Sequence, residues 1–295
     1  MFNFKKAELS DAEELSESFS KYRGRICDYS VGNVLFWRNY YGISFSRDDD
    51  HLILKYSDMG EKECYSYPIS DKPNSTIAEL LKDTGGTLCL TCLTEEQFES
   101  VSKCFDVIEV MHSEDWDDYL YNKKDIVSLA GRKYSGQRNH INKFKKLYPD
   151  AKFDVITKEN VHIAKQFCLD FFDHIGNPTK VSDTELCQLK EQLDNWEIYK
   201  QLGGILSVGD KVVGVSVGEI VKDTLIVHTE KADTSFDGAY PMLVNCFARE
   251  FAKDEDCLFI NREEDCGIEG LRISKQSYHP IEIIKKYAVT IKELS

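Results

Sequence analysis

The chain has 295 residues and a formal net charge of −14, and 42% of its residues are hydrophobic and 12% aromatic. This composition excludes a disordered chain. The negative field excludes general affinity for nucleic acid, although a local basic patch still acts at short range. No stretch is apolar over the roughly 20 residues that a membrane-spanning helix needs, so we expect no integral membrane segment.

The start of the chain and its cysteines indicate the compartment. Residues 1–15 lack the apolar segment that is typical of a signal peptide. The ten cysteines are scattered through hydrophobic segments, which favours reduced, buried thiols and a cytoplasmic protein. Cys89 and Cys92 have CxxC spacing, but on the expected strand they point to opposite faces. We interpret them as core cysteines and predict no metal site, with metal or redox use as the alternative.

The first half of the chain predicts alternating strands and helices. Ser75 and Gly85 mark the start and the stop of one helix, and turn residues separate three consecutive strands. In chain order we expect a strand, two helices, three strands, a helix, a strand, a helix and a strand, at residues 4–9, 12–22, 30–42, 43–49, 51–58, 62–69, 75–85, 87–93, 94–105 and 107–113.

The second half predicts the same order, with a hairpin turn at Gly209 and Asp210. The expected elements lie at residues 152–157, 158–176, 183–202, 203–210, 211–221, 223–232, 240–254, 257–263, 267–278 and 280–291. This is the element order of the GNAT acyltransferase fold. Its repetition predicts an α/β protein of two tandem GNAT-like domains, residues 1–130 and 131–295, with an interdomain cleft.

The segment at the junction of the two predicted domains is basic. Residues 131–146 hold six Lys or Arg residues and no Asp or Glu. On a helix Arg138 and Lys145 share one face, and arginine suits bidentate contact with phosphate. One interpretation is a phosphate clamp for an RNA acceptor stem or a nucleotide cofactor, and the other is a solvated helix that bridges the domains. The candidate phosphate-binding residues are Arg132, Lys133, Arg138, Asn139 and Lys145.

Three stretches carry a resemblance to a known family: DDYLYNKKDIVSLAGRKYSGQRNHINKF, HTEKA and FINREEDCGIEGLRISKQSYHP. They resemble the DUF2156 group, which is akin to the C-terminal domain of phosphatidylglycerol lysyltransferases and related to the Fem aminoacyltransferases. Gln137 departs from the pattern at a position that is often basic. The matching residues are Tyr119, Tyr121, Gly131, Arg138, Asn139, Phe144, Asn261, Arg262, Glu263, Asp265, Gly267, Gly270, Leu271, Arg272, Lys275, Tyr278 and Pro280.

The resemblance implies tandem GNAT-like domains and an acyltransferase that moves an aminoacyl group from a charged tRNA to an amine or hydroxyl acceptor. The lysyltransferases carry a membrane domain ahead of this unit, and this sequence does not contain one. We therefore leave the acceptor open between a small molecule and a lipid headgroup, and expect tRNA as a partner.

The expected strand 223–232 and the segment after it contribute candidate residues. Glu230 and Lys231 alternate across the strand, so one of them faces the cleft, unless both are surface charges. The following segment, FDGAYP, contains Asp237 and no Lys or Arg, whereas acetyl-CoA users carry a Gly-rich, basic turn there. This difference argues against ordinary binding of CoA.

The expected strand 257–263 ends at the edge where open α/β sheets commonly place ligands. Arg262 suits a carboxylate or phosphate, and Glu263 or Asp265 suits accepting a proton from an attacking amine. The alternatives are a helix cap for Asp265 and a core position for Tyr278. We assign catalytic roles to Glu230, Glu263, Asp265 and Tyr278, and substrate binding to Lys231, Asn261, Arg262 and Lys275.

The leading prediction is thus an aminoacyltransferase that uses a charged tRNA. The sequence firmly implies no cofactor; aminoacyl-tRNA is the expected donor and acyl-CoA the less favoured one. Two alternatives stay open, a CoA-dependent N-acyltransferase and a non-catalytic module that binds RNA or a small anionic ligand.

Overall fold

The computed structural model describes residues 2–57, 62–173 and 180–294. The chain divides into two compact units. Unit 1 comprises Met1–Asp118, Glu264–Glu269 and Ile283–Ser295, and unit 2 comprises Tyr119–Glu263 and Gly270–Glu282. Each unit has its own sheet and its own hydrophobic core.

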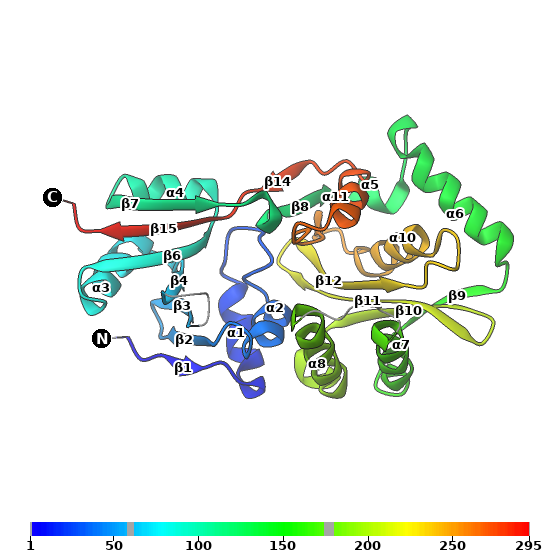
Figure 1. The fold of residues 1–295 in the computed structure, drawn as a ribbon, viewed down its shortest axis with the longest axis horizontal. Coiled ribbons are helices and arrows are strands. Elements are labelled where there is room, and N and C mark those ends of the chain that lie inside the picture. Colours follow the sequence, from blue (N-terminus) through cyan, green and yellow to red (C-terminus); the bar gives the residue numbers. More distant parts are fainter. Residues whose placement is uncertain (1, 58–61, 174–179, 295) are drawn as a thin grey trace. The chain divides into compact units, whose positions relative to one another are not determined.

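Unit 1 is built on an eight-stranded sheet with the order β1-β2-β3-β4-β6-β15-β7, in which β5 pairs with β3. The last strand of the chain, β15, lies antiparallel between β6 and β7 (Figure 1). The elements are β1 (Lys5–Lys6), η1 (Leu9–Asp11), α1 (Ala12–Phe19), α2 (Val31–Trp37), β2 (Ile43–Arg47), β3 (His51–Tyr56), β4 (Cys64–Ser66), β5 (Ile69–Ser70), α3 (Pro73–Asp83), β6 (Thr87–Leu93), α4 (Glu95–Ser102), β7 (Asp106–His112), η2 (Glu114–Trp116) and β15 (Tyr287–Lys292).

Unit 2 is built on a seven-stranded sheet with the order β14-β8-β13-β12-β11-β10-β9. Some of its elements extend across the boundaries of the units by one or two residues. They are β8 (Asp118–Asn122), α5 (Lys123–Ser128), η3 (Arg132–Tyr134), α6 (Ser135–Leu147), β9 (Ala151–Val155), α7 (Val161–Asp173), α8 (Lys180–Asp194), α9 (Trp196–Tyr199), β10 (Leu202–Val208), β11 (Lys211–Val221), β12 (Thr224–Ala232), α10 (Ala239–Phe251), β13 (Phe259–Asn261), α11 (Glu269–Gln276) and β14 (Glu282–Ile284).

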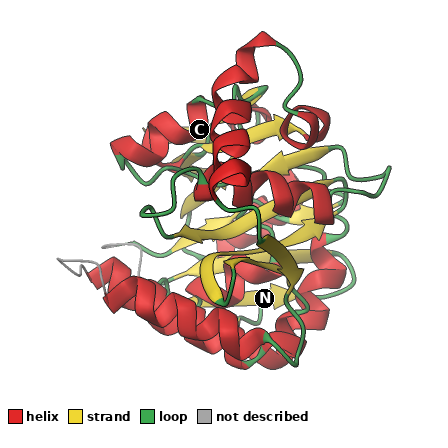
Figure 2. Ribbon diagram, turned by 90° about the vertical axis from the view of Figure 1, so that its right-hand side faces the viewer, coloured by secondary structure: helices red, strands yellow, loops and turns green. Residues whose placement is uncertain are grey.

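Helices cover both faces of the sheet of unit 2. Helix α10 lies on one face, and α7 and α8 lie on the other (Figure 1), so that helices flank the strands as Figure 2 shows. Val244 and Phe247 of α10 belong to the same buried cluster as Leu225 and Val227 of β12. Burial of such a side chain stabilises the fold by about 1.5–3 kcal/mol, so packing against the sheet fixes α10 and the strand beside it.

The predicted hairpin between β10 and β11 is confirmed. Val208 pairs with Lys211, which leaves Gly209 and Asp210 as a two-residue loop. Gly209 has φ +56°. A two-residue hairpin turn of type II′ has such a positive φ at its first central residue, and glycine adopts it without strain.

The structure differs from the predicted elements at several ends. The strand expected at 280–291 is two strands, β14 and β15. The helix expected at 183–202 is also two helices, α8 and α9, and α9 ends at Tyr199, where Lys200 takes a left-handed conformation. The predicted ends at residues 58 and 176 lie outside the described residues. No helix in the described part of the chain has the length and apolar content needed to cross a bilayer.

The two units also divide the chain differently from the predicted domains 1–130 and 131–295. Residues 119–130 belong to unit 2, because β8 pairs with β13, for example Tyr121 with Ile260. The end of the chain belongs to unit 1, because β15 completes its sheet. The boundaries of the two units thus depend on strand pairing between segments that are distant in the sequence.

Candidate functional site

Strands β12 and β13 of unit 2 part at the carboxyl end of β13. Their parallel pairing ends where Ile226 meets Asn261, whereas β12 continues to Ala232. The residue after β13 still pairs with β8, because the backbone N–H of Arg262 donates to the carbonyl of Tyr119 at 3.1 Å. Beyond Ile226, no strand in the described part of the chain therefore pairs with β12 on the side that would face β13. Carboxyl ends of strands are where open α/β sheets commonly bind ligands.

The other side of β12 carries a β-bulge at the same level. The register with β11 shifts between Val217 and Gly218, which leaves His228 as the extra residue. A Cβ atom at Gly218 would lie 2.3 Å from the carbonyl oxygen of Ile226, so only glycine allows this close approach. Bulges re-aim side chains and are common next to active sites.

A buried ion pair spans the parted strands. The Nε and Nη2 atoms of Arg262 both donate to Oε2 of Glu230, at 3.0 and 2.6 Å. Arg262 is only 6% exposed. Burial disfavours its charge, but Glu230 and two nearby tyrosines outweigh this, and the pKa of Arg262 is raised. The guanidinium therefore stays charged and is fixed in place beside β12.

Two polar atoms next to this ion pair have no partner among the described residues. They are Nη1 of Arg262 and the hydroxyl of Tyr278, and both are buried. The guanidinium carbon lies 4.9 Å from the centre of the Tyr278 ring and 6.0 Å from that of Tyr121. Burial raises the pKa of Tyr278 to about 12, so it is a neutral phenol near pH 7. Buried polar groups are normally hydrogen-bonded, so both atoms suit a ligand oxygen.

His228 bridges two carboxylates. Its Nδ1 lies 2.7 Å from Oε1 of Glu263, and its Nε2 lies 2.9 Å from Oε1 of Glu219. Burial alone would lower the pKa of His228, but the two glutamates raise it to about 10. At neutral pH His228 is therefore an imidazolium that orients both carboxylates and cannot accept a proton itself. Gln201 adds a hydrogen bond to Glu219 at 3.1 Å.

The turn that carries Arg262 and Glu263 is held by neighbouring polar groups. Nζ of Lys275 donates to the carbonyl of Arg262 at 2.6 Å and to that of Glu263 at 3.1 Å. The side chain of Asn261 accepts from the N–H of Glu263 at 2.7 Å. Glu263 has φ +56°, which costs a non-glycine residue on the order of 1–3 kcal/mol and is common at functional sites. Lys275 and Asn261 thus position this turn through its backbone.

Two other predicted residues have different partners. Lys231 forms an ion pair with Glu185 of α8 at 2.7 Å and lies over the ring of Phe172 at 5.3 Å. Asp265 belongs to unit 1, and its carboxylate accepts a hydrogen bond from the N–H of Gly267 at 2.8 Å in the turn before α11. This bond orders the turn, but Gly267 precedes α11, so the bond is not a cap of that helix.

The N-terminus of α10 is covered by α6. Gly238, with φ +88°, precedes α10, and a Cβ atom there would lie 2.6 Å from the carbonyl oxygen of His140 and 3.1 Å from Cβ of Phe144. Lys143 of α6 forms an ion pair with Asp237 just before the helix. A helix N-terminus binds phosphate through its free N–H groups. Here the backbone and side chains of α6 lie where such a ligand would approach.

The basic segment forms η3 and α6, and part of its charge is paired. Nη1 of Arg138 donates to the carbonyls of Leu129 and Gly131, where the chain turns after α5. Lys133 forms an ion pair with Asp125 at 3.0 Å. The remaining predicted phosphate-binding residues are exposed; they are Arg132, Asn139 and Lys145. Arg138 therefore stabilises the turn after α5 through these two carbonyls, and the phosphate clamp stays a prediction.

With this geometry in place, the chain can be compared with known proteins. The sequence model of one family, described as "Phosphatidylglycerol lysyltransferase, C-terminal", matches residues 19–290. The chain belongs to this family. The predicted fold class is confirmed as well: the chain consists of tandem GNAT-like α/β domains. The predicted element order is present in each half, except that three predicted elements are each divided in two, into β4 and β5, α8 and α9, and β14 and β15.

Three solved structures are similar over nearly their whole length. A conserved protein of unknown function from Bacteroides thetaiotaomicron VPI-5482 is 32% identical with a TM-score of 0.88, covering 99% of this chain and 100% of that one. L-PGS from Bacillus licheniformis is 14% identical with a TM-score of 0.64, covering 94% and 91%. The C-terminal domain (DUF2156) of a putative lysylphosphatidylglycerol synthetase from Agrobacterium fabrum is 12% identical with a TM-score of 0.65, covering 96% and 92%. The last two similarities, at 14% and 12% identity, show only that those proteins share the fold of this chain.

A curated relative matches in part. An uncharacterized protein of Mycoplasmoides gallisepticum is 28% identical over 201 residues, which are 68% of this chain and 63% of that protein. The match therefore spans less than two thirds of the relative's length.

The family resemblance named Arg262, Glu263 and Tyr278, but His228 and Glu219 were not assigned from the sequence. Glu219 is the one carboxylate in the mostly apolar strand 211–221, and this is the feature of the sequence that could have indicated it. Nothing in the sequence placed it opposite His228, because a bulge shifts the register between them.

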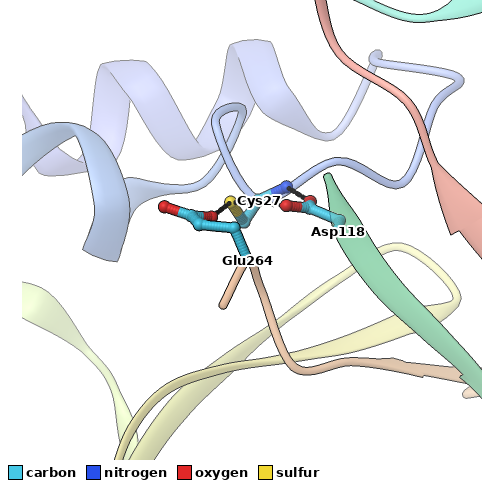
Figure 3. A group of neighbouring side chains, drawn as sticks. All are labelled: Cys27, Asp118 and Glu264. Atoms are coloured by element: carbon cyan, nitrogen blue, oxygen red, sulfur yellow. Dashed lines mark hydrogen bonds between the residues drawn. The ribbon is translucent and has the colours of Figure 1, made fainter. Parts of the chain in front are cut away.

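A second polar cluster lies within unit 1 (Figure 3). Oδ2 of Asp118 accepts from the N–H of Cys27 at 2.7 Å, and Sγ of Cys27 lies 3.5 Å from Oε2 of Glu264. These residues offer ligand atoms close enough for a metal ion. However, Nζ of Lys286 lies 2.9 Å from Oδ1 of Asp118, 3.4 Å from Glu264 and 3.1 Å from Asp28. The ammonium group takes the place that a cation would need among these atoms.

Proposed function

We propose that this chain is an acyltransferase that moves an aminoacyl group from a charged tRNA to an amine or hydroxyl acceptor. The observation that carries the proposal is that one buried polar atom on Arg262 and one on Tyr278, beside the point where β12 and β13 part, have no hydrogen-bond partner among the described residues. Membership of the phosphatidylglycerol lysyltransferase C-terminal family supports the reaction class.

The protein does not need to activate the donor, because an aminoacyl ester is already activated. The protein has to orient the acceptor, take a proton from it and stabilise the developing oxyanion. We assign the oxyanion to backbone N–H groups of β12 beyond Ile226, where the ladder with β13 has ended. Arg262 and Tyr278 hold a polar oxygen of the donor or acceptor through Nη1 and the phenol.

Glu263 is the proposed proton acceptor. Its carboxylate is oriented by His228, which keeps its own proton because its pKa is raised to about 10. Glu230 is engaged with two nitrogens of Arg262, so its task is to position the guanidinium. This refines the predicted roles, in which both glutamates were catalytic.

The surroundings of α10 favour tRNA over acyl-CoA as the donor. In acyl-CoA users the pyrophosphate binds at the helix that follows the fourth strand, but here α6 covers that position and Asp237 adds negative charge. A terminal adenosine ester brings no pyrophosphate and does not need this site. The family description names phosphatidylglycerol, so a headgroup hydroxyl is one acceptor class to test.

A discharge assay tests the proposal. Pooled tRNA charged with labelled amino acids is incubated with the protein and with three acceptor classes: amines, soluble hydroxyl compounds and phosphatidylglycerol vesicles. Transfer of label to one class supports the proposal. Transfer of acetyl groups from acetyl-CoA instead, with a dissociation constant in the low-micromolar range (about −8 kcal/mol), overturns it. Binding of tRNA without any transfer supports the non-catalytic alternative.

A further inference from the structure

Cys64 and Cys89 lie opposite each other on neighbouring strands of unit 1. Strands β4 and β6 are parallel, and Cys64 pairs directly with Cys89 in their register. The two Sγ atoms are 2.9 Å apart, and each residue is 7% exposed. Both thiols are free. The register of the sheet, rather than a flexible side chain, brings the two sulfur atoms together.

The geometry allows a covalent bond with little movement. Neighbouring strands lie about 4.8 Å apart, and disulfides join residues whose Cα atoms are roughly 4.4–6.8 Å apart. The sulfur atoms need to approach by less than an ångström to reach a bond length of about 2.05 Å. Such a bond would close a loop of 25 residues that contains α3.

A pocket gives small molecules a route to Cys89. Its volume is about 670 Å³, and Cys89 lines it together with Tyr65, Ile108 and Thr290. Lys62 and Glu109 lie on the same pocket and form an ion pair at 2.9 Å. A molecule as small as a hydroperoxide fits this space.

The two thiols are electrostatically different. The hydrogen bond from Cys64 lowers the pKa of Cys89, and the nearby charge of Lys62 lowers it further, while burial opposes both. The same hydrogen bond raises the pKa of Cys64. Cys89 is also the thiol of the pair that lines the pocket, so a small oxidant reaches it there. Because the thiolate is the reactive form, we assign Cys89 as the nucleophile of the pair.

We propose that Cys64 and Cys89 form a redox-sensitive thiol pair that hydrogen peroxide oxidises to a disulfide between β4 and β6. The Cys89 thiolate attacks one peroxide oxygen, the O–O bond breaks, and the leaving hydroxide takes a proton to become water. The sulfur of Cys64 then attacks the sulfenic sulfur, the S–O bond breaks, and hydroxide leaves with the thiol proton as a second water. The two thiols lose two electrons to the peroxide. This inference concerns unit 1 and does not depend on the proposed function.

Peptide mapping of the whole chain tests the proposal. The folded, reduced protein is treated with one equivalent of hydrogen peroxide, the peroxide is removed, and the remaining thiols are alkylated in denaturant. A digest is then analysed by mass spectrometry without reductant. The matched variants are Cys64→Ser and Cys89→Ser, with Cys168→Ser as a control for a buried thiol on α7 of unit 2.

The expected product in wild type and in Cys168→Ser is a cross-link between Cys64 and Cys89 that dithiothreitol reverses. It leaves eight of the ten thiols alkylated in wild type and seven of the nine in Cys168→Ser. In Cys64→Ser, Cys89 stops at sulfenic acid, because serine still donates to it but cannot close the bond. In Cys89→Ser, Cys64 stays reduced. A cross-link of Cys89 to Cys92, or no loss of the two thiols in wild type, overturns the proposal. The wild-type result decides the question even if a variant fails to fold.

Discussion

Replacing Tyr278 with phenylalanine separates a ligand-binding hydroxyl from a structural one. The ring is 3% exposed, and its hydroxyl has no partner among the described residues. Leaving a buried polar group unpaired costs about 1–3 kcal/mol. Phenylalanine has the same shape without that group, so Tyr278→Phe should raise the free energy of unfolding by about 1 kcal/mol. In a chain of this size the melting temperature should rise by about 2–4 °C.

Tyr121→Phe is the matched control. The ring of Tyr121 also faces Arg262, but its hydroxyl donates to the carbonyl of Lys275 at 2.8 Å. Removing this hydrogen bond should lower the free energy of unfolding by about 1 kcal/mol or more. The same chemical change at two rings beside one guanidinium thus has opposite expected signs. Urea unfolding of the three proteins, followed by fluorescence, measures both. An equal loss of stability in both variants would refute the reasoning and make Tyr278 an ordinary core residue.

Three other predictions follow from named contacts. Arg138→Ala should lower the free energy of unfolding by about 1.5–3 kcal/mol, because two backbone carbonyls lose a charged donor, whereas Lys145→Ala should stay within about 0.5 kcal/mol and weaken only tRNA binding. The pKa of His228 is raised to about 10 in the folded state, above its usual value of about 6.5, so its contribution to stability is full below about pH 6.5 and is lost as the pH rises toward 10. Urea unfolding across this range should therefore show the advantage of wild type over His228→Gln shrinking as the pH rises. Lys286→Met should lower the free energy of unfolding by about 3–5 kcal/mol, because Asp118 is fully buried and loses its ammonium partner.

Each of these has a clear contrary result. Equal stability of Arg138→Ala and wild type would return Arg138 to the group of free phosphate-binding candidates. A difference between wild type and His228→Gln that does not change with pH would show that the imidazole is neutral. A stable Lys286→Met protein that binds a divalent cation would show that the ammonium group only substitutes for a metal ion.

The order of the elements was predictable because each signal is local. Turn residues such as Gly209 and Asp210, caps and apolar periodicity depend on near neighbours, and the structure has the GNAT order in both halves. The partition of the chain was not predictable in this way. That β15 inserts between β6 and β7, and that β8 joins β13, are pairings between distant segments, which no local pattern encodes.

The site was predictable in part for the same reason. The expected carboxyl end of the strand 257–263 placed Arg262 and Glu263 at an edge of the sheet. The alternation of side chains along β12 placed Glu230 and Lys231 on opposite faces of that strand. The ion pair of Arg262 with Glu230 requires the parting of two strands. The bridge from His228 to Glu219 requires a bulge. Neither the parting of the strands nor the bulge can be predicted from the amino-acid sequence alone.

Single-turnover discharge of aminoacyl-tRNA tests the central claim most directly. Labelled charged tRNA, excess protein and the acceptor class found by screening are mixed, and the transferred label is followed over time for wild type, Tyr278→Phe and Tyr121→Phe. We expect transfer by wild type and a loss of roughly ten- to a hundredfold in Tyr278→Phe, since a hydrogen bond in the reacting complex is worth about 1.5–3 kcal/mol when one partner is charged. Tyr121→Phe should transfer at close to the wild-type rate. No transfer by wild type with any charged tRNA, or the same rate in Tyr278→Phe, would contradict the account.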